Sequence, residues 1–166
     1  MKAAEPPLQR ARDLALKYLT AAARTEVQLR ARLEKAGLAE QADDVVVWLR
    51  ELRYLDDGSF ARGRARVLVA SGRVGPRVVE QRLQRAGIAA GAARAAVAGA
   101  LAEEAPGGEV ALCRALAERR ARGTPLDRLD ARARGRLARF LLGRGFSGSS
   151  VARVLGGFDD RDLEEP

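Results

Sequence analysis

The chain has 166 residues, of which 47% are hydrophobic and 4% aromatic, and its 30 Lys and Arg against 22 Asp and Glu give a net charge of +8. It contains no His, so the most common general base is absent. Its one Cys, Cys113, excludes an intrachain disulfide and a zinc cluster. No apolar run approaches the roughly 20 residues of a membrane span, and residues 1–7 lack the apolar stretch of a signal peptide. We therefore expect a soluble cytoplasmic protein with Cys113 in its core, whose excess positive charge suits an anionic partner.

One pattern, two apolar residues four apart followed by Gly and a further apolar residue, occurs three times along the chain. The copies are Leu29-x3-Leu33-x3-Gly37-Leu38, Val79-x3-Leu83-x3-Gly87-Ile88 and Leu137-x3-Leu141-x3-Gly145-Phe146. Residues four apart share a helical face, and Gly just past a helix end closes the last turn in the left-handed conformation. Three copies in register predict an internal repeat.

Each copy has a predicted helix before it and another after it. The earlier helices are expected near residues 8–22, 58–71 and 108–122, and the later ones near 40–54, 90–103 and 147–156. Their inward faces are expected to present Leu14, Tyr18, Leu19, Val45, Trp48, Leu49 and Leu52, then Phe60, Val67, Leu68, Ala93, Val97, Ala100 and Leu101, then Val110, Cys113, Leu116, Ala117, Val151, Val154 and Leu155. No segment shows the alternation of a half-buried strand.

We therefore predict an all-α protein of three tandem three-helix repeats, at residues 8–55, 56–105 and 106–158, followed by an acidic flexible tail at 159–166. A unit of about 50 residues buries little surface by itself, so the units are expected to stack as helical arrays do. The predicted shape is an elongated, curved rod, and we expect a monomer.

Arginines form stripes on the second and third predicted units. Those of the second unit are expected to make one continuous basic patch and are Arg62, Arg66, Arg73, Arg77, Arg82 and Arg85, and those of the third are Arg132, Arg136 and Arg139. A single stripe is also typical of a solvated helix face, but two stripes on adjacent units favour contact with phosphate.

No motif for covalent chemistry is present. The sequence lacks the Gly-rich phosphate loop and its Lys that an ATPase needs. The adjacent Asp pairs, at residues 43–44, 56–57 and 159–160, fall near predicted helix ends, where carboxylates cap free N–H groups. No Ser has a His partner. We expect a protein that is not an enzyme and that uses no metal and no cofactor.

The stretch Tyr54-Leu55-Asp56-Asp57-x-x-Phe60-Ala61, followed by Gly75-Pro76 and by Leu83-x3-Gly87-Ile88, resembles the central repeat of the RecX family. Residues 23–37 resemble its first repeat, and the resemblance extends over about residues 10–157. Arg53 departs from the Gly that the family often has before this Tyr, and the third unit is divergent, with a longer loop near residues 123–127. The residues expected to be structural, joining the units rather than binding, are Tyr54, Asp57, Phe60, Gly75, Pro76 and Gly87. In that group Asp57 is expected to cap the helix near Gly58, and Tyr54, Leu55 and Phe60 are expected to pack between units one and two.

The resemblance implies a regulator that binds RecA and RecA filaments on single-stranded DNA. Such a protein modulates, mainly by inhibition, the ATPase, strand-exchange and co-protease activities of RecA, and so acts in DNA repair, recombination and the SOS response to DNA damage. Single-stranded DNA is then a partner that is bound weakly or through the filament, and no membrane is involved. The alternative is a sequence-independent DNA-binding helical module acting without RecA. A third interpretation, a small enzyme, is disfavoured by the missing His.

Overall fold

The computed structural model describes residues 5–157, so the predicted acidic tail lies outside the described residues. Every α-helix in that range belongs to one of three groups, here called units 1, 2 and 3: α1 (Pro7–Ala21), α2 (Glu26–Lys35) and α3 (Ala42–Glu51), then α4 (Asp57–Ala70), α5 (Pro76–Arg85) and α6 (Ala90–Glu104), then α7 (Gly108–Ala121), α8 (Ala131–Gly143) and α9 (Gly148–Leu155). Short 3-10 helices lie at Ala39–Gln41 and Leu126–Arg128, and no strand occurs among the described residues.

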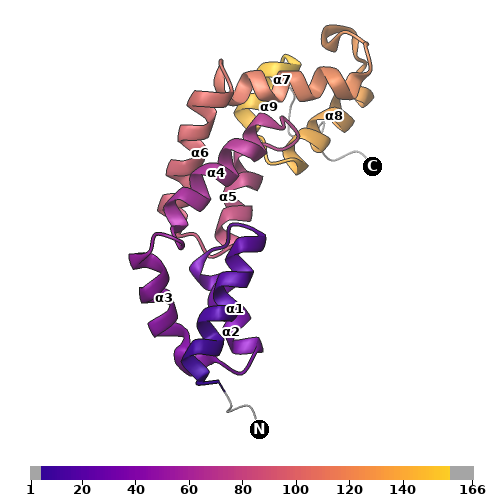
Figure 1. Ribbon diagram of the computed structural model, residues 1–166. Helices are drawn as coiled ribbons and strands as arrows, with labels where there is room; N and C mark the ends of the chain where they lie inside the picture. The colour runs from indigo at the N-terminus through magenta and orange to yellow at the C-terminus, as the bar shows by residue number, and fades with distance from the viewer. Residues whose placement is uncertain (1–4, 158–166) are drawn as a thin grey trace.

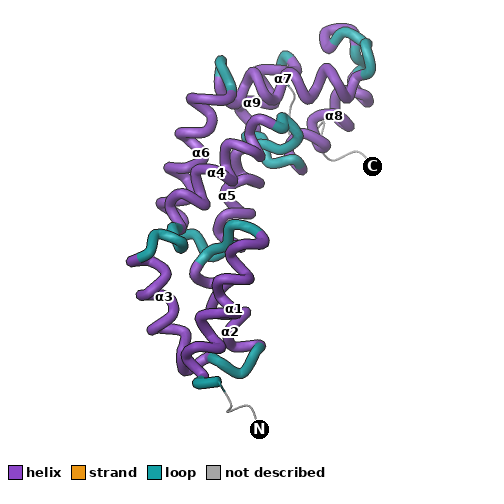
Figure 2. The backbone as a smooth tube through the Cα atoms, viewed as in Figure 1, coloured by secondary structure: helices purple, strands orange, loops and turns teal. Residues whose placement is uncertain are grey.

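The three units follow one another along an elongated, bent rod, with unit 1 at one end and unit 3 at the other (Figure 1, Figure 2). The predicted all-α class and three-helix repeats are thus confirmed, as is the elongated, curved shape. Within residues 5–157, no helix combines the length and the apolar character needed to cross a bilayer.

Each unit has its own cluster of buried side chains, built on the repeated pattern. Both apolar residues of every copy are buried, and so are the residues after the three glycines, namely Leu38, Ile88 and Phe146. Full burial of such a side chain stabilises a fold by about 2 kcal/mol relative to exposure. Gly37, Gly87 and Gly145 have φ values of +71°, +97° and +90°, which confirms the predicted left-handed turns.

Cys113 lies fully inside the core of unit 3, as predicted. Burial, reinforced by the negative charge of Glu109, raises the pKa of the Cys113 thiol to about 11. The thiol is therefore protonated at neutral pH and behaves as a small apolar side chain.

Several residues predicted to face inward do not. Leu52 is 47% exposed and Val67 is 63% exposed. In α1 the fully buried positions are Ala11 and Ala15, whereas the larger residues Leu14, Tyr18 and Leu19 are only half-buried around them. Small side chains let this helix approach its neighbours closely, so the pattern of large residues alone marked the contact face incorrectly.

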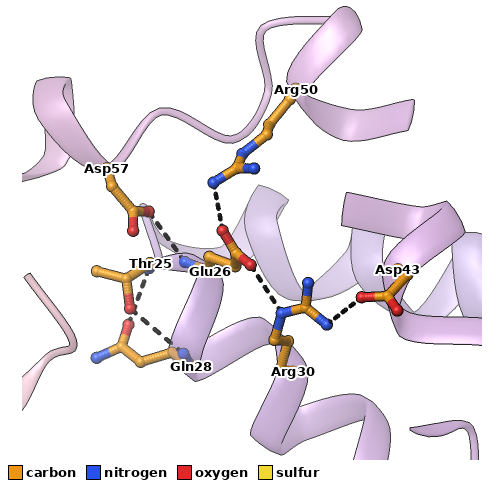
Figure 3. Close-up of polar contacts among 7 residues, drawn as sticks. All are labelled: Thr25, Glu26, Gln28, Arg30, Asp43, Arg50 and Asp57. Atoms are coloured by element: carbon orange, nitrogen blue, oxygen red, sulfur yellow. Dashed lines mark hydrogen bonds and ion pairs between the residues drawn. The ribbon is translucent and has the colours of Figure 1, made fainter. Parts of the chain in front are cut away.

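Asp57 does not cap α4, contrary to the prediction. Asp56 takes that role by accepting a hydrogen bond from the backbone N–H of Ser59 at 2.9 Å. Asp57 instead accepts from the backbone N–H of Glu26 in unit 1, also at 2.9 Å (Figure 3). The second carboxylate of the pair therefore connects two units instead of ending one helix.

The first joint, between units 1 and 2, is held mainly by side chains. Thr25 is fully buried and caps α2 in a reciprocal capping box with Gln28 (Figure 3). Its hydroxyl also donates to the backbone oxygen of Ala86. The Gly87 turn of unit 2 packs against Val27, so closely that a Cβ on Gly87 would lie 2.6 Å from the Val27 Cβ. The turn that ends α5 is thus seated on the start of α2.

The second joint, between units 2 and 3, repeats this arrangement with backbone atoms. The N–H of Gly75 donates to the oxygen of Arg144 at 2.8 Å, and the N–H of Arg77 donates to the oxygen of Gly145 at 3.2 Å. A Cβ on Gly75 would lie 2.5 Å from the carbonyl carbon of Gly145. The turn that ends α8 therefore packs on the start of α5, with the Val78 side chain against Gly145 and with direct hydrogen bonds between the two backbones.

Among residues 5–157, no neighbouring unit packs on the equivalent surfaces of unit 1 and unit 3. The Gly37 turn, which ends α2 of unit 1, meets no atom within 4 Å of a Cβ added there. The start of α8 in unit 3 is capped by Asp130, whose carboxylate accepts from the N–H of Ala133 at 2.6 Å.

Candidate functional site

A groove of about 930 Å³ opens beside the first joint, and we call it the junction groove. It is lined by the turn before α2, the turn after α3, one face of α4 and the end of α5. The lining residues are Ala22, Ala23, Arg24, Gln28, Arg53, Tyr54, Asp56, Ser59, Phe60, Gly63, Arg64, Val67, Arg82, Arg85 and Ala86. Residues up to about sixty positions apart meet here only because the joint holds the two units together.

The junction groove is strongly basic, with five arginines and a single carboxylate. That carboxylate, Asp56, is engaged by the backbone N–H and the hydroxyl of Ser59, and these hydrogen bonds lower the pKa of Asp56. Within residues 5–157, none of the five arginines forms an ion pair with a carboxylate. Arg24 is half-buried and stacks over the ring of Tyr18 at 4.8 Å, whereas the other four arginines are exposed.

Exposed apolar side chains lie between these arginines. Tyr54 is 62% exposed and Val67 is 63% exposed, and Phe60 is half-buried beside them. Tyr54 was expected to pack between the units, and the structure corrects that expectation. Of the large hydrophobic side chains that are exposed in the described part of the chain, Tyr54 is the aromatic one.

The turn that presents Tyr54 contains a strained residue. The N–H of Tyr54 donates to the oxygen of Leu49 at 2.9 Å, and the N–H of Arg53 donates to the oxygen of Arg50 at 3.0 Å. This is the helix-ending motif that normally has Gly at the left-handed position, yet Arg53 occupies it with a φ of +58°. A side chain there costs about 1 kcal/mol relative to Gly, so the rim of the groove holds a cation at a position where it destabilises the turn.

The structure divides the predicted basic patch of unit 2. Arg82 and Arg85 line the junction groove, but Arg62 and Arg66 lie on another side of α4, in a groove of about 410 Å³ against α6. There Arg66 pairs with Glu103 at 3.2 Å and with Glu104 at 3.0 Å. The six arginines therefore do not form one continuous patch. On α4 it is Arg64 that shares the junction groove with Arg82 and Arg85, whereas Arg62 and Arg66 lie in the groove against α6.

The other predicted binding residues lie farther along the rod. Arg73 and Arg77 are exposed near the second joint, and Arg77 contributes its backbone N–H to that joint. On α8 of unit 3, Arg132 and Arg136 are exposed and Arg139 is half-buried. None of these five lines the junction groove. Their predicted roles in binding stay predictions.

Three arginines of the junction groove were not predicted as binding residues: Arg24, Arg53 and Arg64. One signal was available in the sequence, the departure of Arg53 from the Gly that the RecX family often has before the Tyr. The residues expected to be structural lie as follows: Gly75 and Gly87 in the two joints, Pro76 at the start of α5, Asp57 bonded to unit 1, and Tyr54 and Phe60 in the groove.

The carboxylates and Cys113 of the described chain do not gather into one site. In the part of the chain that the structure describes, no group of three His, Cys, Asp or Glu side chains is arranged to hold a metal ion. What the junction groove offers is guanidinium donors and apolar surface, and this combination binds anions and flat rings but performs no bond-making chemistry by itself.

Comparisons with known proteins agree on one family. Family models match residues 11–49 as the RecX first three-helix domain and residues 108–155 as the RecX third three-helix domain. The chain is 34% identical over 153 residues to the regulatory protein RecX of Acidithiobacillus ferrooxidans, covering 90% of this chain and 91% of that protein. It is 36% identical over 136 residues to the regulatory protein RecX of Syntrophotalea carbinolica, covering 80% of this chain and 86% of that protein.

Solved structures show the same fold. A crystal structure of RecX from Lactobacillus salivarius superposes with a TM-score of 0.77 at 20% identity, covering 95% of this chain and 97% of that one. A second crystal structure, of a regulatory protein RecX, gives a TM-score of 0.72 at 25% identity over 90% of this chain and 73% of that one. With its relatives matching over most of its length and its three-helix units in the same arrangement, the chain belongs to the RecX family.

Proposed function

We propose that this chain is a cytoplasmic regulator that binds RecA and RecA filaments on single-stranded DNA, and that it mainly inhibits RecA ATPase, strand exchange and co-protease activity. The observation that carries the proposal is the similarity to proteins named regulatory protein RecX over 90% of the chain. The proposal places the protein in DNA repair, recombination and the SOS response, and it assigns the chain no cofactor and no catalytic step.

The shape and charge of the molecule support this function. An elongated rod has a long surface for its mass and suits contact with several neighbouring subunits of a filament. The exposed arginines of the junction groove are suited to carboxylates of a protein surface and to phosphates of a bound strand. A ligand that binds one state of a cycling filament more tightly slows its exit from that state, so binding alone accounts for inhibition of hydrolysis.

The direct test is a titration of this chain, at fewer copies than RecA subunits, into RecA assembled on single-stranded DNA while ATP hydrolysis is followed. We expect inhibition at these low ratios. The variant Arg82→Glu/Arg85→Glu should require about tenfold more protein, since it removes two charge-assisted contacts. A matched control, Arg10→Glu/Arg94→Glu, changes two exposed arginines outside both grooves and should inhibit as the wild type does.

Unchanged hydrolysis, together with no binding to the filament in a sedimentation assay, would contradict the proposal. Equal weakening by the groove variant and by the control would show that only net charge matters, and would remove the groove from the mechanism.

A second candidate function, a DNA-binding module that acts without RecA, is favoured by the unpaired arginines of the junction groove. It predicts tight binding to naked DNA with a steep dependence on salt. The RecA-directed function predicts weak binding to naked DNA and stronger binding to the filament. Parallel gel-shift titrations with naked strand and with filament separate the two.

A further inference from the structure

We propose that the junction groove binds a segment of single-stranded nucleic acid, with one base stacked on Tyr54 and the neighbouring phosphates held by Arg53, Arg64, Arg82 and Arg85. The inference rests on the proposed function, to which it adds the part of this chain that receives the strand. It concerns a site that includes residues of units 1 and 2 together.

The first support is the pairing state of the arginines. Outside the groove, Arg30 pairs with Glu26 and Asp43, Arg50 pairs with Glu26, and Arg66 pairs with two glutamates. Carboxylates of the same chain therefore neutralise the positive charge of these three arginines. The four exposed groove arginines have no carboxylate within ion-pair distance among residues 5–157, and the one acid nearby is bonded to Ser59. The groove is therefore an unneutralised cationic surface, which favours a polyanion.

The second support is the exposed ring. A base in a duplex is stacked on both faces and leaves nothing for a protein ring to cover, whereas a base in a single strand is free to stack on an aromatic side chain. Tyr54 presents a ring that is 62% exposed, and Val67 and Phe60 provide apolar surface beside it. An aromatic ring between arginines that track a phosphate backbone is the arrangement found in proteins that bind single strands without sequence preference.

The third support is the strain at Arg53. The left-handed residue and the exposed Tyr are adjacent, so the turn after α3 offers a cation for a phosphate and a ring for a base on neighbouring residues. Gly at that position would relieve the strain and remove the cation. A residue held in a costly conformation at the rim of a groove points to a binding role for its side chain.

An acidic peptide is the competing occupant. It would satisfy the guanidinium groups equally well, but it has no chemical need of a flat exposed ring and would gain more from a closed apolar pocket. The groove instead has cations on four chain segments around an exposed ring, which suits a chain that carries both phosphates and flat bases.

The experiment measures fluorescence anisotropy of a labelled oligothymidylate of about 20 nucleotides, at about 50 mM salt, titrated with the full chain in the absence of RecA. Tyr54→Ala should weaken binding about tenfold, because loss of one stacked base has an effect of this size, and Tyr54→Phe should bind within about twofold of wild type. Val47→Ala, an exposed apolar control on α3 outside the groove, should have no effect.

Two further measurements separate the contribution of base stacking to binding from the contribution of phosphate contacts. A strand of equal length with abasic sites should bind wild type and Tyr54→Ala equally, since it has phosphates but no bases. Arg64→Gln/Arg85→Gln should reduce the slope of log K against log salt by about 1.4, at roughly 0.7 for each lost phosphate contact on a single strand. The control Arg10→Gln/Arg94→Gln should leave that slope at its wild-type value.

Equal affinity of wild type and Tyr54→Ala for the oligothymidylate would overturn the inference. Tighter binding of duplex than of single strand would also overturn it. If polyglutamate of matched charge displaced the strand equally well from wild type and from Tyr54→Ala, an acidic peptide would be identified as the occupant, and the inference would again be overturned. RecA inhibition is measured separately. If the wild-type chain did not inhibit RecA but still bound the strand in a Tyr54-dependent way, the proposed function would be contradicted and this inference would stand.

Discussion

The two joints of the rod bring equivalent elements together, but different atoms make the contacts. In each, the Gly turn of one unit is seated on the start of the second helix of the unit before it. At the first joint the capping residue of that helix is Thr25, and its hydroxyl bridges to the Ala86 oxygen. At the second joint the equivalent residue is Gly75, and the two backbones bond directly. A side chain between two backbones holds them apart, and its absence lets them touch.

The junction groove lies beside the joint whose capping residue carries a side chain. The first joint has a groove of about 930 Å³ beside it, whereas the second joint is held by backbone hydrogen bonds and by the Arg119 guanidinium, which donates to the backbone oxygen of Gly72. Because a Cβ on Gly75 would meet backbone atoms, we expect the second joint to be intolerant of any added atom and the first joint to be adjustable.

The largest effect is expected for Gly75→Ala. The φ of Gly75 is −83°, which any residue adopts, but the added Cβ would lie 2.5 Å from the carbonyl carbon and oxygen of Gly145. Backbone atoms cannot move singly, so the joint must open, and we expect the free energy of unfolding to fall by about 3 kcal/mol. Urea denaturation followed by circular dichroism measures this change.

Gly99→Ala is the matched control for that variant. Gly99 lies in the interior of α6 and a Cβ there meets nothing within 4 Å, so the same substitution should stabilise the chain by about 0.5–1 kcal/mol. A Gly75→Ala variant as stable as wild type would show that the second joint is not closed in the way described.

A somewhat smaller effect is expected for Gly87→Ala at the first joint. Its Cβ would clash with the Val27 side chain, and its φ of +97° disfavours Ala, so we expect a loss of about 2 kcal/mol. Val27 is 52% exposed and ends in movable methyl groups. The double variant Val27→Ala/Gly87→Ala should therefore recover about half of the loss, with the backbone strain remaining. Thermal melts of Gly87→Ala, Val27→Ala and the double variant test this. Losses that add up in the double variant would contradict an adjustable first joint.

Thr25→Val tests the bridge itself. The substitution keeps the shape but removes the buried hydroxyl, which caps α2 and donates to Ala86, and we expect a loss of about 2 kcal/mol. Thr25→Ser keeps the hydroxyl and should lose less than half as much. Chemical denaturation of both variants supplies the measurement. Equal losses would assign the effect to packing and not to the hydroxyl.

The smallest effect on stability is expected for Arg53→Gly, and its sign is opposite. Gly relieves the left-handed strain, so we expect a gain of about 1 kcal/mol and a rise in melting temperature of about 3 °C. The same variant should bind the labelled oligothymidylate more weakly, because a groove cation is lost. A variant that is less stable than wild type would contradict the strain at this turn.

The repeats were predictable from the sequence because each places its apolar pair and its Gly at fixed helical spacing, and the apolar pair of every copy is buried in the structure. The alanine face of α1 was not predicted in this way. Ala11 and Ala15 take the contact positions of α1, because small side chains permit close approach where larger ones do not. For the same reason, apolar periodicity alone did not show that Val67 faces solvent.

The junction groove could not be derived from helical spacing. Spacing correctly indicated that Arg82 and Arg85 lie near each other, but it grouped them with Arg62 and Arg66, which face α6. Which side of α4 meets α5 depends on how the helices of unit 2 pack and on the angle at the first joint. That angle is set by contacts such as Asp57 to Glu26, between residues 31 positions apart, which no local pattern encodes.

The Gly37 turn offers a point at which the rod could be extended by design. It has the same left-handed Gly as the Gly87 and Gly145 turns, and among residues 5–157 no atom lies within 4 Å of a Cβ added there. At the opposite end, the start of α8 presents the Asp130 carboxylate, which would repel the carbonyl oxygen of an incoming turn. A three-helix unit could therefore be grafted onto the Gly37 turn by supplying a helix start like that of α2 or α5. Extension at α8 would first require Asp130 to be replaced by Thr or Gly, the residues at the equivalent positions of the first and second joints.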